Sequence, residues 1–389
     1  MQYRKFGKLD WKVSALGFGC MRLPTIEGDS ANIDEPEATK MVHYAIDHGV
    51  NYVDTAYPYH GGNSERFLGQ ALQGGYRERV KLATKLPCWL VEETGDFDKL
   101  FSEQLEKLQT DHVDFYLLHG LNAGRWPKMR DLGVIEWAEK MIADGRIRYL
   151  GFSFHDVYDV FKEIVDARDW TFCQIQYNYM DIDYQAGVKG LQYAASKGLA
   201  VVIMEPLLGG ALVDSPPQIQ AMWDSAATKR SAADWALQWL WNQPEVSTVL
   251  SGMSAMQHVE ENLASADASG VGTLTAEELA LVERVRARFD ELCPIPCTQC
   301  EYCMPCPNGV NIPRNLKTYN GGLIYDKLDQ ARGIYRWLSQ DMHSGADACI
   351  QCRECEDKCP QSIPISEWMP VVHEVLGEGK PYDACPMPQ

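Results

Sequence analysis

Short apolar runs alternate with amphipathic stretches from about residue 15 to about residue 266. Each apolar run has the length and the β-branched or aromatic content of a buried strand. The stretches between the runs place apolar residues at helical spacing, as in the segment between Pro36 and Gly49. The runs are Leu16–Met21, Asn51–Asp54, Val80–Lys85, Val113–His119, Ile147–Ser153, Phe172–Gln176, Ala200–Met204 and Val246–Ser251.

Eight strands that alternate with helices over some 250 residues predict a (β/α)8 barrel of the TIM type. A doubly wound open sheet is the competing fold, and it normally carries a Gly-x-Gly-x-x-Gly turn after its first strand. The chain begins that pattern at Gly17-Phe-Gly19 but has Arg22 where the third glycine belongs. We therefore expect the barrel, with the segments Tyr3–Phe6 and Trp11–Val13 forming a hairpin that closes its floor.

Ten cysteines fall in the last hundred residues, and eight of them form two groups of four. The first group is Cys297, Cys300, Cys303 and Cys306, and the second is Cys349, Cys352, Cys355 and Cys359. The groups are offset by 52 or 53 residues and each ends in Cys-Pro, so they form an internal repeat. The second group reads C-x2-C-x2-C-x3-C-P, the spacing of bacterial ferredoxins, which predicts two [4Fe–4S] clusters. Structural zinc and disulfides are the alternatives, and they fit two packed quartets poorly.

In two-cluster ferredoxins the fourth cysteine of each run binds the cluster of the other run. We therefore expect Cys359 to complete the cluster of the first quartet and Cys306 to complete that of the second. The surrounding segment is mostly helical in character, with too little apolar sequence to fold without its clusters. We divide the chain into a barrel at residues 1–288 and a smaller, mainly α-helical, ferredoxin-like iron–sulfur domain at residues 289–389.

Charge and cysteine content narrow the partners and the compartment. The net charge is −18 and no basic stripe occurs, which excludes nucleic acid as an expected partner. No apolar run is long enough to span a bilayer, and thirteen cysteines suit a reducing compartment, so we expect a cytoplasmic protein. Of the five other cysteines, Cys20, Cys88 and Cys173 are expected to fill the core, and Cys293 and Cys385 receive no role.

Three consecutive predicted strands end in an ionisable residue: Asp54, Lys85 and His119. In a (β/α)8 barrel the reacting groups lie at the carboxyl ends of the strands, which is where these three residues would meet. Singly, each has a structural explanation, as a cap, a solvated lysine or a satisfied core histidine. At equivalent positions on neighbouring strands, they favour a catalytic site.

The residues around these strand ends resemble the aldo/keto reductases. The resemblance rests on Asp54-Thr-Ala-x-x-Tyr59, Asn63-Ser-Glu65, Thr84-Lys85, Asp114 to His119, Gly151-Phe-Ser153 and Glu261-Asn262, and it runs from about residue 3 to residue 267. With the cysteine-rich tail, the chain looks like the ferredoxin-fused branch of that family. The resemblance implies a catalytic tetrad of Asp54, Tyr59, Lys85 and His119.

Chemistry supports these implied roles. Reducing a carbonyl by hydride leaves an alkoxide that needs a proton, and tyrosine is a weak acid unless its anion is stabilised. We expect the ammonium of Lys85 to lower the pKa of Tyr59, Asp54 to hold Lys85 charged, and neutral His119 to orient the carbonyl oxygen. Tyr57 is the rival acid, and we expect it to be a pocket wall instead.

The resemblance also implies where a nicotinamide dinucleotide would bind. Ser153 and Gln174 would hold its carboxamide, and loops after the last two strands would meet its phosphates, as barrels often arrange. A capping-box spacing at Ser254 and Gln257 predicts a helix N-terminus there. The full implied set is Ser153, Gln174, Met204, Pro206, Leu207, Ser251, Gly252, Ser254, His258, Glu261 and Asn262.

Several of these positions depart from the family pattern. Met204 replaces the tyrosine that stacks on the nicotinamide, and Phe154 replaces an asparagine. Gly252 and His258 stand where basic residues clamp the 2′-phosphate of NADP(H). We therefore expect NADP(H) to bind less tightly than NAD(H), or neither nucleotide to bind well, unless Lys229 and Arg230 supply the missing charge.

Two functions remain open. The first is an oxidoreductase that acts on a small carbonyl or alcohol substrate in the barrel and is coupled to, or supported by, the two clusters. The second is an electron-transfer iron–sulfur protein whose barrel binds a ligand or partner without hydride chemistry. In either case a redox partner such as a ferredoxin is a candidate. The loop Gly120–Arg130 is expected to shape the substrate pocket.

Overall fold

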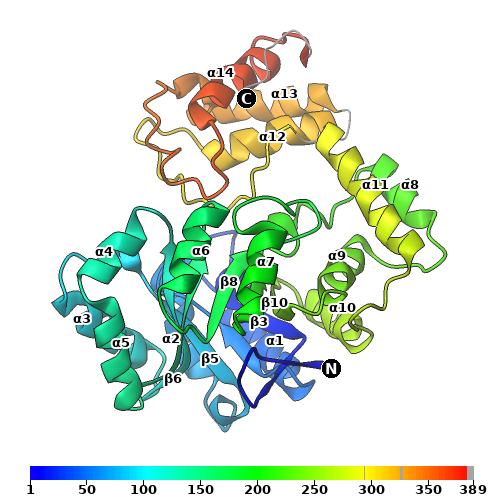
Figure 1. Ribbon diagram of the computed structural model, residues 1–389. Helices are drawn as coiled ribbons and strands as arrows, with labels where there is room; N and C mark the ends of the chain where they lie inside the picture. Colours follow the sequence, from blue (N-terminus) through cyan, green and yellow to red (C-terminus); the bar gives the residue numbers. More distant parts are fainter. Residues whose placement is uncertain (293, 325–326, 383–389) are drawn as a thin grey trace. The chain divides into compact units, whose positions relative to one another are not determined.

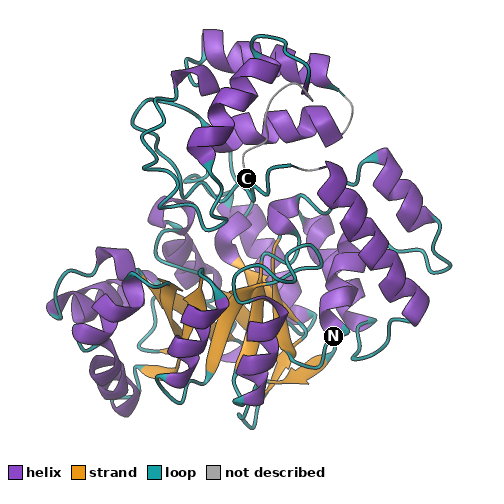
Figure 2. Cartoon of the chain, turned by 45° about the horizontal axis from the view of Figure 1, so that its top comes forward, coloured by secondary structure: helices purple, strands orange, loops and turns teal. Residues whose placement is uncertain are grey.

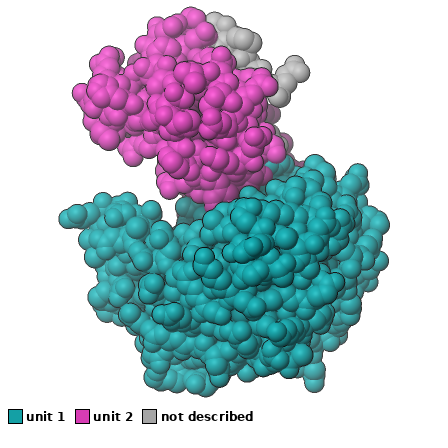
Figure 3. Space-filling view, turned by 90° about the vertical axis from the view of Figure 1, so that its left-hand side faces the viewer, with its two compact units in different colours: residues 1–207, 233–276 teal, residues 208–232, 277–389 magenta. Residues whose placement is uncertain are grey.

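The computed structural model describes residues 1–389 except 293, 325–326 and 383–389, so Cys293 and Cys385 lie outside the described residues. Contacts between residues divide the chain into two compact units (Figure 3). Unit 1 comprises residues 1–207 and 233–276, and unit 2 comprises residues 208–232 and 277–389. No helix in the described part of the chain is both long and apolar enough to cross a membrane.

Unit 1 is a closed barrel of eight parallel strands, which confirms the predicted fold and rules out the open sheet (Figure 1). The strands pair in the order β10, β3, β4, β5, β6, β7, β8 and β9, and β9 closes on β10. Their bounds are β3 (Leu16–Gly19), β4 (Tyr52–Asp54), β5 (Lys81–Leu86), β6 (Val113–Leu121), β7 (Ile147–Phe154), β8 (Phe172–Gln176), β9 (Ala200–Met204) and β10 (Val246–Gly252).

Helices surround these strands, as Figure 2 shows in purple around orange. Asp34 caps the first of them by accepting a hydrogen bond from the backbone N–H of Glu37, and a proline stands in its first turn. The helices of this unit are α1 (Glu35–Asp47), α2 (Ser64–Ala71), α3 (Gly95–Lys107), α4 (Arg125–Asp131), α5 (Val134–Ala143), α6 (Tyr158–Asp166), α7 (Gly187–Ser196), α9 (Ala232–Trp241) and α10 (Met256–Asp267).

The hairpin of β1 (Tyr3–Lys5) and β2 (Lys12–Ser14) forms as predicted, with antiparallel pairing. The fully buried Phe6 follows β1 and packs against Tyr52, Phe115 and Phe172 inside the barrel, with its ring 4.8 Å from that of Phe115. A second, larger apolar layer fills the space between strands and helices. The barrel interior is thus a packed core, which leaves the carboxyl ends of the strands for chemistry.

Unit 2 contains no strand among its described residues. Its helices are α8 (Pro217–Asp224), α11 (Ala276–Leu292), α12 (Ile312–Ile324), α13 (Leu328–Arg336) and α14 (Ile365–Leu376). An ion pair of 2.6 Å between Arg230 and Glu278 ties the segment 208–232 to α11. A small apolar core built on Tyr319, Trp368 and Met369 lies between α12 and α14 and borders six of the eight quartet cysteines, either as members or as packed neighbours.

Short helices complete the connections. They are the 3-10 helices η1 (Cys20–Arg22), η2 (Tyr59–Gly62), η3 (Arg77–Arg79), η4 (Cys88–Leu90), η5 (Leu208–Gly210) and η7 (Ala346–Ala348), and the π-helix η6 (Trp337–Asp341).

Candidate active site and cluster sites

The barrel brings together the four residues that the resemblance implied. Asp54 is the last residue of β4, while Lys85 and His119 lie near the ends of β5 and β6. Because these strands are parallel neighbours in the barrel, their ends share one rim. Tyr59 opens η2, five residues after Asp54. The chain turn between them, Thr55 to Pro58, returns the tyrosine ring over Lys85 at 4.8 Å.

Lys85 is the centre of the group. Its Nζ donates to Asp54 Oδ1 at 2.6 Å, to the carbonyl oxygen of Thr55 at 2.9 Å and to the hydroxyl of Tyr59 at 3.2 Å. The lysine is fully buried and Asp54 is 2% exposed, so the pair is shielded from water. The ring of His119 stands edge-on to that of Tyr59, with their centroids 6.2 Å apart. An ammonium bridges a carboxylate and a phenol here, which is an arrangement suited to proton transfer.

The electrostatics differ from expectation at one residue. Burial, followed by the charge of Lys85, holds the pKa of His119 well below its usual value, so this imidazole is neutral at pH 7. Burial, followed by the charges of Asp54 and Glu205, raises the pKa of Tyr59 well above its usual value. The expected lowering of the Tyr59 pKa by Lys85 is therefore wrong, because burial is the largest influence on this phenol and raises its pKa.

A buried polar network stands behind Lys85. The side-chain nitrogen of Gln104 donates to the carbonyl oxygen of Lys85 at 3.0 Å and to Glu65 Oε1 at 2.7 Å. Glu65 also accepts from Thr84, and Tyr116 donates to Gln104 Oε1 at 2.7 Å. Burial raises the pKa of Glu65. The network links α2, α3, β5 and β6 and so positions the lysine.

Sequence analysis missed Gln104, although a polar residue within the apolar stripe of α3 was a usable signal. The structure shows the partners of Tyr57, the rival acid. Its hydroxyl donates to the carboxylate of Glu103 at 3.2 Å, and the ammonium of Lys107 lies 4.0 Å from its ring centroid. Tyr57 therefore contacts α3 rather than the Lys85 group.

The two residues that the resemblance assigns to the nicotinamide carboxamide lie side by side on adjacent strands. Ser153 of β7 pairs in register with Gln174 of β8, and both are almost fully buried. The hydroxyl of Ser153 accepts from the backbone N–H of Gly120 at 2.7 Å, so its own proton is free to donate. Gln174 donates to Met204 Sδ at 3.5 Å, while its Oε1 is buried without a hydrogen-bond partner among the described residues. A donor and an acceptor side by side fit a carboxamide.

The remaining implied positions surround the end of β10. Asn262 donates to the hydroxyl of Ser251 at 3.1 Å, and Glu261 accepts from Gln257 at 2.7 Å. Helix α10 begins after Ala255, without a side-chain cap, so the predicted capping box at Ser254 and Gln257 is wrong. Gln257 instead reaches forward one turn. Gly252, Ser254 and His258 are exposed, Pro206 is buried, and Met204 and Leu207 are half-buried.

Arg22 is a basic residue at this end that sequence analysis did not single out. A Cβ atom at Gly252 would lie 3.1 Å from the Cβ of Arg22, so the glycine leaves room for the arginine. The guanidinium is also close enough to Tyr59 to oppose the rise of the tyrosine pKa. Arg22 therefore brings a positive charge to the end of β10 and near Tyr59.

The cysteines of unit 2 gather around two hollows. One is lined by Cys297, Cys300, Cys303 and Cys359, and the other by Cys306, Cys349, Cys352 and Cys355 together with Cys303. None of these eight cysteines forms a disulfide in the described part of the chain. No three His, Cys, Asp or Glu side chains in the described part of the chain converge on one metal ion. A cubane suits this spacing better than zinc does, because each thiolate of a cubane binds a different iron.

Comparisons with known proteins identify both parts of the chain. The model of the aldo/keto reductase family matches residues 15–287, and that of a 4Fe-4S dicluster domain matches residues 296–363. L-galactose dehydrogenase of Arabidopsis thaliana is 28% identical over 310 residues, which cover 73% of this chain and 94% of that protein. An uncharacterized oxidoreductase of Bacillus subtilis is also 28% identical, over 73% of this chain and 96% of its own.

Solved structures agree. The holo form of an aldo-keto reductase from Bacillus halodurans superposes with a TM-score of 0.62 at 29% identity, covering 73% of this chain and 96% of that one. An aldo-keto reductase from Klebsiella pneumoniae in complex with NADPH has a TM-score of 0.60 at 26% identity, covering 73% and 95%. The predicted resemblance is confirmed: this chain belongs to the aldo/keto reductase family of oxidoreductases and continues into a 4Fe-4S dicluster domain.

Proposed function

We propose that the barrel reduces a small carbonyl compound with a nicotinamide dinucleotide and that Tyr59 donates the proton. The observation that carries this proposal is the bridge that Lys85 makes between Asp54 and the hydroxyl of Tyr59, at 2.6 and 3.2 Å. When bound, the dinucleotide supplies a hydride to the carbonyl carbon. Tyr59 gives its phenolic proton to the carbonyl oxygen, so hydride and proton together complete the alcohol.

The other three residues make this proton transfer feasible. Lys85 stabilises the phenolate that Tyr59 leaves behind, and Asp54 keeps the lysine charged in its buried place. Because His119 is neutral, it donates a hydrogen bond to the carbonyl oxygen without supplying a competing acid. The high pKa of Tyr59 before substrate binds ensures that the proton is present at pH 7.

The nucleotide would be held by Ser153 and Gln174 at its carboxamide and by Arg22 at its pyrophosphate. Support for the first contact comes from the buried, unpartnered Oε1 of Gln174. The pyrophosphate is common to both nucleotides, so Arg22 does not discriminate between them. A 2′-phosphate normally needs Arg or Lys forks, and only Gly252 and His258 occupy those positions.

The two residues that were candidates to replace the phosphate clamp are engaged within unit 2. Lys229 donates to the backbone oxygens of Asp224 and Ala226, and Arg230 pairs with Glu278. We therefore propose NAD(H) over NADP(H), although the relative from Klebsiella pneumoniae was solved with NADPH. Anaerobic titration of both nucleotides tests this preference, and tighter binding of NADPH would overturn it.

For unit 2 we propose two [4Fe–4S] clusters with crossed ligation. One takes Cys297, Cys300, Cys303 and Cys359, and the other takes Cys306, Cys349, Cys352 and Cys355. Support comes from the two cysteine-lined hollows, each of which draws a cysteine from the other quartet. Iron analysis is expected to give about eight irons per chain, and about four would contradict the proposal.

One observation favours the alternative, electron transfer without nicotinamide. Met204 stands where the family has an aromatic residue for stacking, and its sulfur already contacts Gln174. In that case electrons would reach the barrel singly, through the clusters, from a carrier such as a reduced ferredoxin.

Deuterated nucleotide separates the two functions. Under anaerobic conditions, NADH deuterated at the transferring position is incubated with a panel of simple aldehydes. Deuterium at the carbinol carbon of the product supports hydride transfer. An alcohol product that forms only with a reduced one-electron donor, and without deuterium, favours the alternative.

A further inference from the structure

The guanidinium of Arg125 lies near the proposed active site and has no acidic partner in the described part of the chain. Arg125 opens α4, and its Nη1 donates to the carbonyl oxygen of Gly120 at 2.8 Å. Gly120 directly follows His119 in the chain. Among the described residues, no carboxylate lies within ion-pair distance of Arg125, which is half-buried. An arginine has five N–H donors in a planar fork, and the side-chain hydrogen bond to Gly120 uses one of them.

Trp89 connects this charge to the reactive group. The guanidinium carbon of Arg125 lies 5.6 Å from the centroid of the Trp89 ring, and that ring lies 5.0 Å from the ring of His119. Trp89 is 37% exposed, whereas His119 is 4% exposed. Arg125, Trp89 and His119 therefore form a row, with a cation at one end and the proposed carbonyl-orienting residue at the other.

The other charged groups near this row leave Arg125 uncompensated. Asp54 and Lys85 neutralise each other at 2.6 Å. Glu205 is close enough to act on Tyr59, but Arg22 acts there with the opposite sign. Burial lowers the pKa of His155, which acts electrostatically on His119, to about 4, so His155 is neutral at pH 7. The sum of these charges at the carboxyl ends of the strands leaves a positive charge at Arg125, which favours binding of an anion there.

We propose that Arg125 recognises a carboxylate on the substrate and that the barrel acts on carbonyl compounds that carry one. The inference rests on the proposed carbonyl reduction and names its substrate class. Guanidinium groups bind carboxylates through two parallel hydrogen bonds, which fix the orientation of the bound molecule. The apolar face of Trp89 then lines the path between the carboxylate and the carbonyl carbon.

Two aldehydes of equal chain length test the proposal: succinic semialdehyde, which carries a carboxylate, and butanal, which does not. Wild type is expected to prefer succinic semialdehyde in kcat/KM. Arg125→Met should lower kcat/KM for succinic semialdehyde about ten- to a hundredfold, the effect of one charge-assisted contact, and leave butanal unchanged. Arg125→Lys should restore part of the loss. An equal loss on both aldehydes would mean that Arg125 only supports the fold.

Arg130→Met is the matched control, because Arg130 lies on the same helix but is 53% exposed and pairs with Asp131. It should change neither rate. If wild type reduces neither aldehyde, the proposed carbonyl reduction fails, and calorimetry with succinate then tests Arg125 alone. Succinate binding that is lost in Arg125→Met and kept in Arg130→Met supports the anion site; no succinate binding by wild type overturns it.

A second, independent observation concerns the clusters. Gln299 and Gln351 are equivalent positions of the repeat, 52 residues apart, and both have a left-handed φ of 58°. The side chain of Gln299 donates to Cys297 Sγ at 3.3 Å and to the carbonyl oxygen of Pro313 at 2.8 Å. The side chain of Gln351 instead donates to the carbonyl oxygen of Ser366 at 3.0 Å, and only its backbone N–H reaches Cys349 Sγ, at 3.4 Å.

We infer that Gln299 raises the reduction potential of the cluster that Cys297 binds. Hydrogen bonds to cluster sulfurs stabilise the additional negative charge of the reduced state and are one determinant of the potential. The repeat makes the two glutamines a matched pair, since they differ in what the side chain contacts. The Gln299 contact thus favours electrons on the cluster of Cys297, Cys300, Cys303 and Cys359.

Potentiometric titration followed by electron paramagnetic resonance tests this inference. Gln299→Leu is expected to lower the electron affinity of one cluster about three- to tenfold, where tenfold equals about 59 mV for one electron. Gln351→Leu should leave both potentials unchanged. Iron content equal to wild type verifies that both variants are loaded. Equal shifts in the two variants, or none in Gln299→Leu, would overturn the inference, whatever the barrel catalyses.

Discussion

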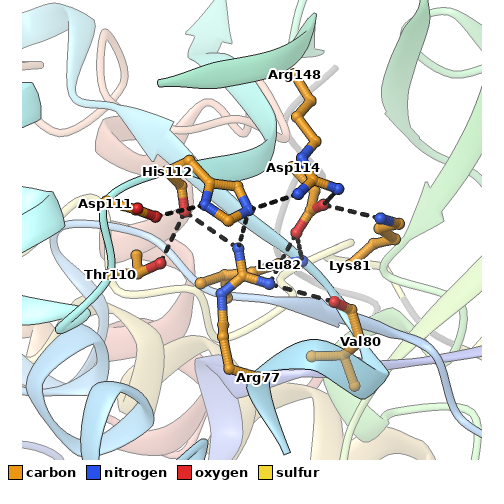
Figure 4. Close-up of polar contacts among 9 residues, drawn as sticks. All are labelled: Arg77, Val80, Lys81, Leu82, Thr110, Asp111, His112, Asp114 and Arg148. Carbon is orange, nitrogen blue, oxygen red and sulfur yellow. Dashed lines mark hydrogen bonds and ion pairs between the residues drawn. The ribbon is translucent and has the colours of Figure 1, made fainter. Parts of the chain in front are cut away.

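The two ends of strands β5 and β6 carry similar charges and use them differently. At the amino end, the buried carboxylate of Asp114 accepts from Arg77 at 2.9 Å, from Lys81 at 3.1 Å, from Arg148 at 3.1 Å and from the backbone N–H of Leu82 at 3.0 Å (Figure 4). The side chains of Arg77, Lys81 and Arg148 all point toward this carboxylate. Both of its oxygens therefore have partners.

At the carboxyl end, more polar atoms lack partners than in the amino-end network, where Arg77 Nε is one such buried atom among the described residues. Asp54 Oδ1 accepts from Lys85, but Asp54 Oδ2 is buried without a partner among the described residues. His119 Nδ1 and Gln174 Oε1 are in the same condition. A satisfied network stabilises a fold, whereas buried polar groups without partners are kept where a ligand will complete them. The comparison supports the proposal that the chemistry occurs at the carboxyl end of the barrel, while the amino end stabilises the fold.

Removing the proposed acid should have the largest effect, on rate and not on stability. Tyr59→Phe is expected to lower kcat by about 10²–10⁴-fold, the usual contribution of general acid catalysis, with an unfolding curve close to wild type. Tyr57→Phe is the control, because that hydroxyl contacts Glu103. A greater rate loss in Tyr57→Phe than in Tyr59→Phe would show that the acid has been misassigned.

Removing the carboxylate at the amino end should do the reverse. Asp114→Asn leaves Arg77 and Lys81 without their counter-charge and is expected to destabilise the barrel by about 3 kcal/mol in urea unfolding. Asp47→Asn is the control, because Asp47 pairs with Arg79 at the surface and should leave the unfolding free energy nearly unchanged. If Asp114→Asn lowered the reaction rate but not the stability, the assignment of a purely structural role to the amino end would be wrong.

Lowering the pH should reduce the stabilisation from His119, at the carboxyl end, and from Asp114, at the amino end, over different pH ranges. The pKa of His119 is lower in the folded state than in the unfolded one, so its contribution to stability is lost as pH falls below about 6.5. Burial tends to raise the pKa of Asp114, but Arg77, the backbone of Leu82 and Lys81 outweigh it and lower the pKa. The contribution of Asp114 is therefore complete above about pH 4 and is lost as pH falls through the folded pKa.

Unfolding free energies measured from pH 7 to pH 3 check both parts. Between pH 6.5 and 5, His119→Gln should reduce the slope of the unfolding free energy against pH by at most about 1.4 kcal/mol per pH unit. That value corresponds to a difference of one bound proton between the folded and unfolded states. His155 keeps a similar contribution in that variant, because its folded pKa is also lowered. Asp114→Asn should flatten only the segment below pH 4. The same change of slope in both variants would contradict the separation of the two ends.

The smallest expected effect comes from the outermost cation of the amino end. Arg148 is 46% exposed, so Arg148→Met should destabilise the barrel by less than about 1 kcal/mol. His112 Nε2 still contacts Arg77 in that variant, which preserves most of the network. A loss as large as that of Asp114→Asn would mean that Arg148, rather than the buried carboxylate, holds this end together.

Local patterns were sufficient to predict the barrel and the central residues of its rim. The spacing of apolar runs specified eight parallel strands, and Asp54, Lys85 and His119 could be grouped because parallel neighbours end at one rim. The cysteine repeat likewise predicted the dicluster domain that the family model confirms. These features depend on backbone periodicity and covalent spacing, both of which can be read along the chain.

Only the tertiary structure decided which other side chains meet these residues. Gln104 reaches Lys85 from α3, Trp89 and Arg125 meet beside His119, and Arg22 lies against Gly252. It also reversed the direction of the Tyr59 pKa and moved the cap of α10 to Ala255. The physical reason is the same in each case. Burial and contact between distant segments set these properties, and neither distance nor desolvation is encoded in local spacing.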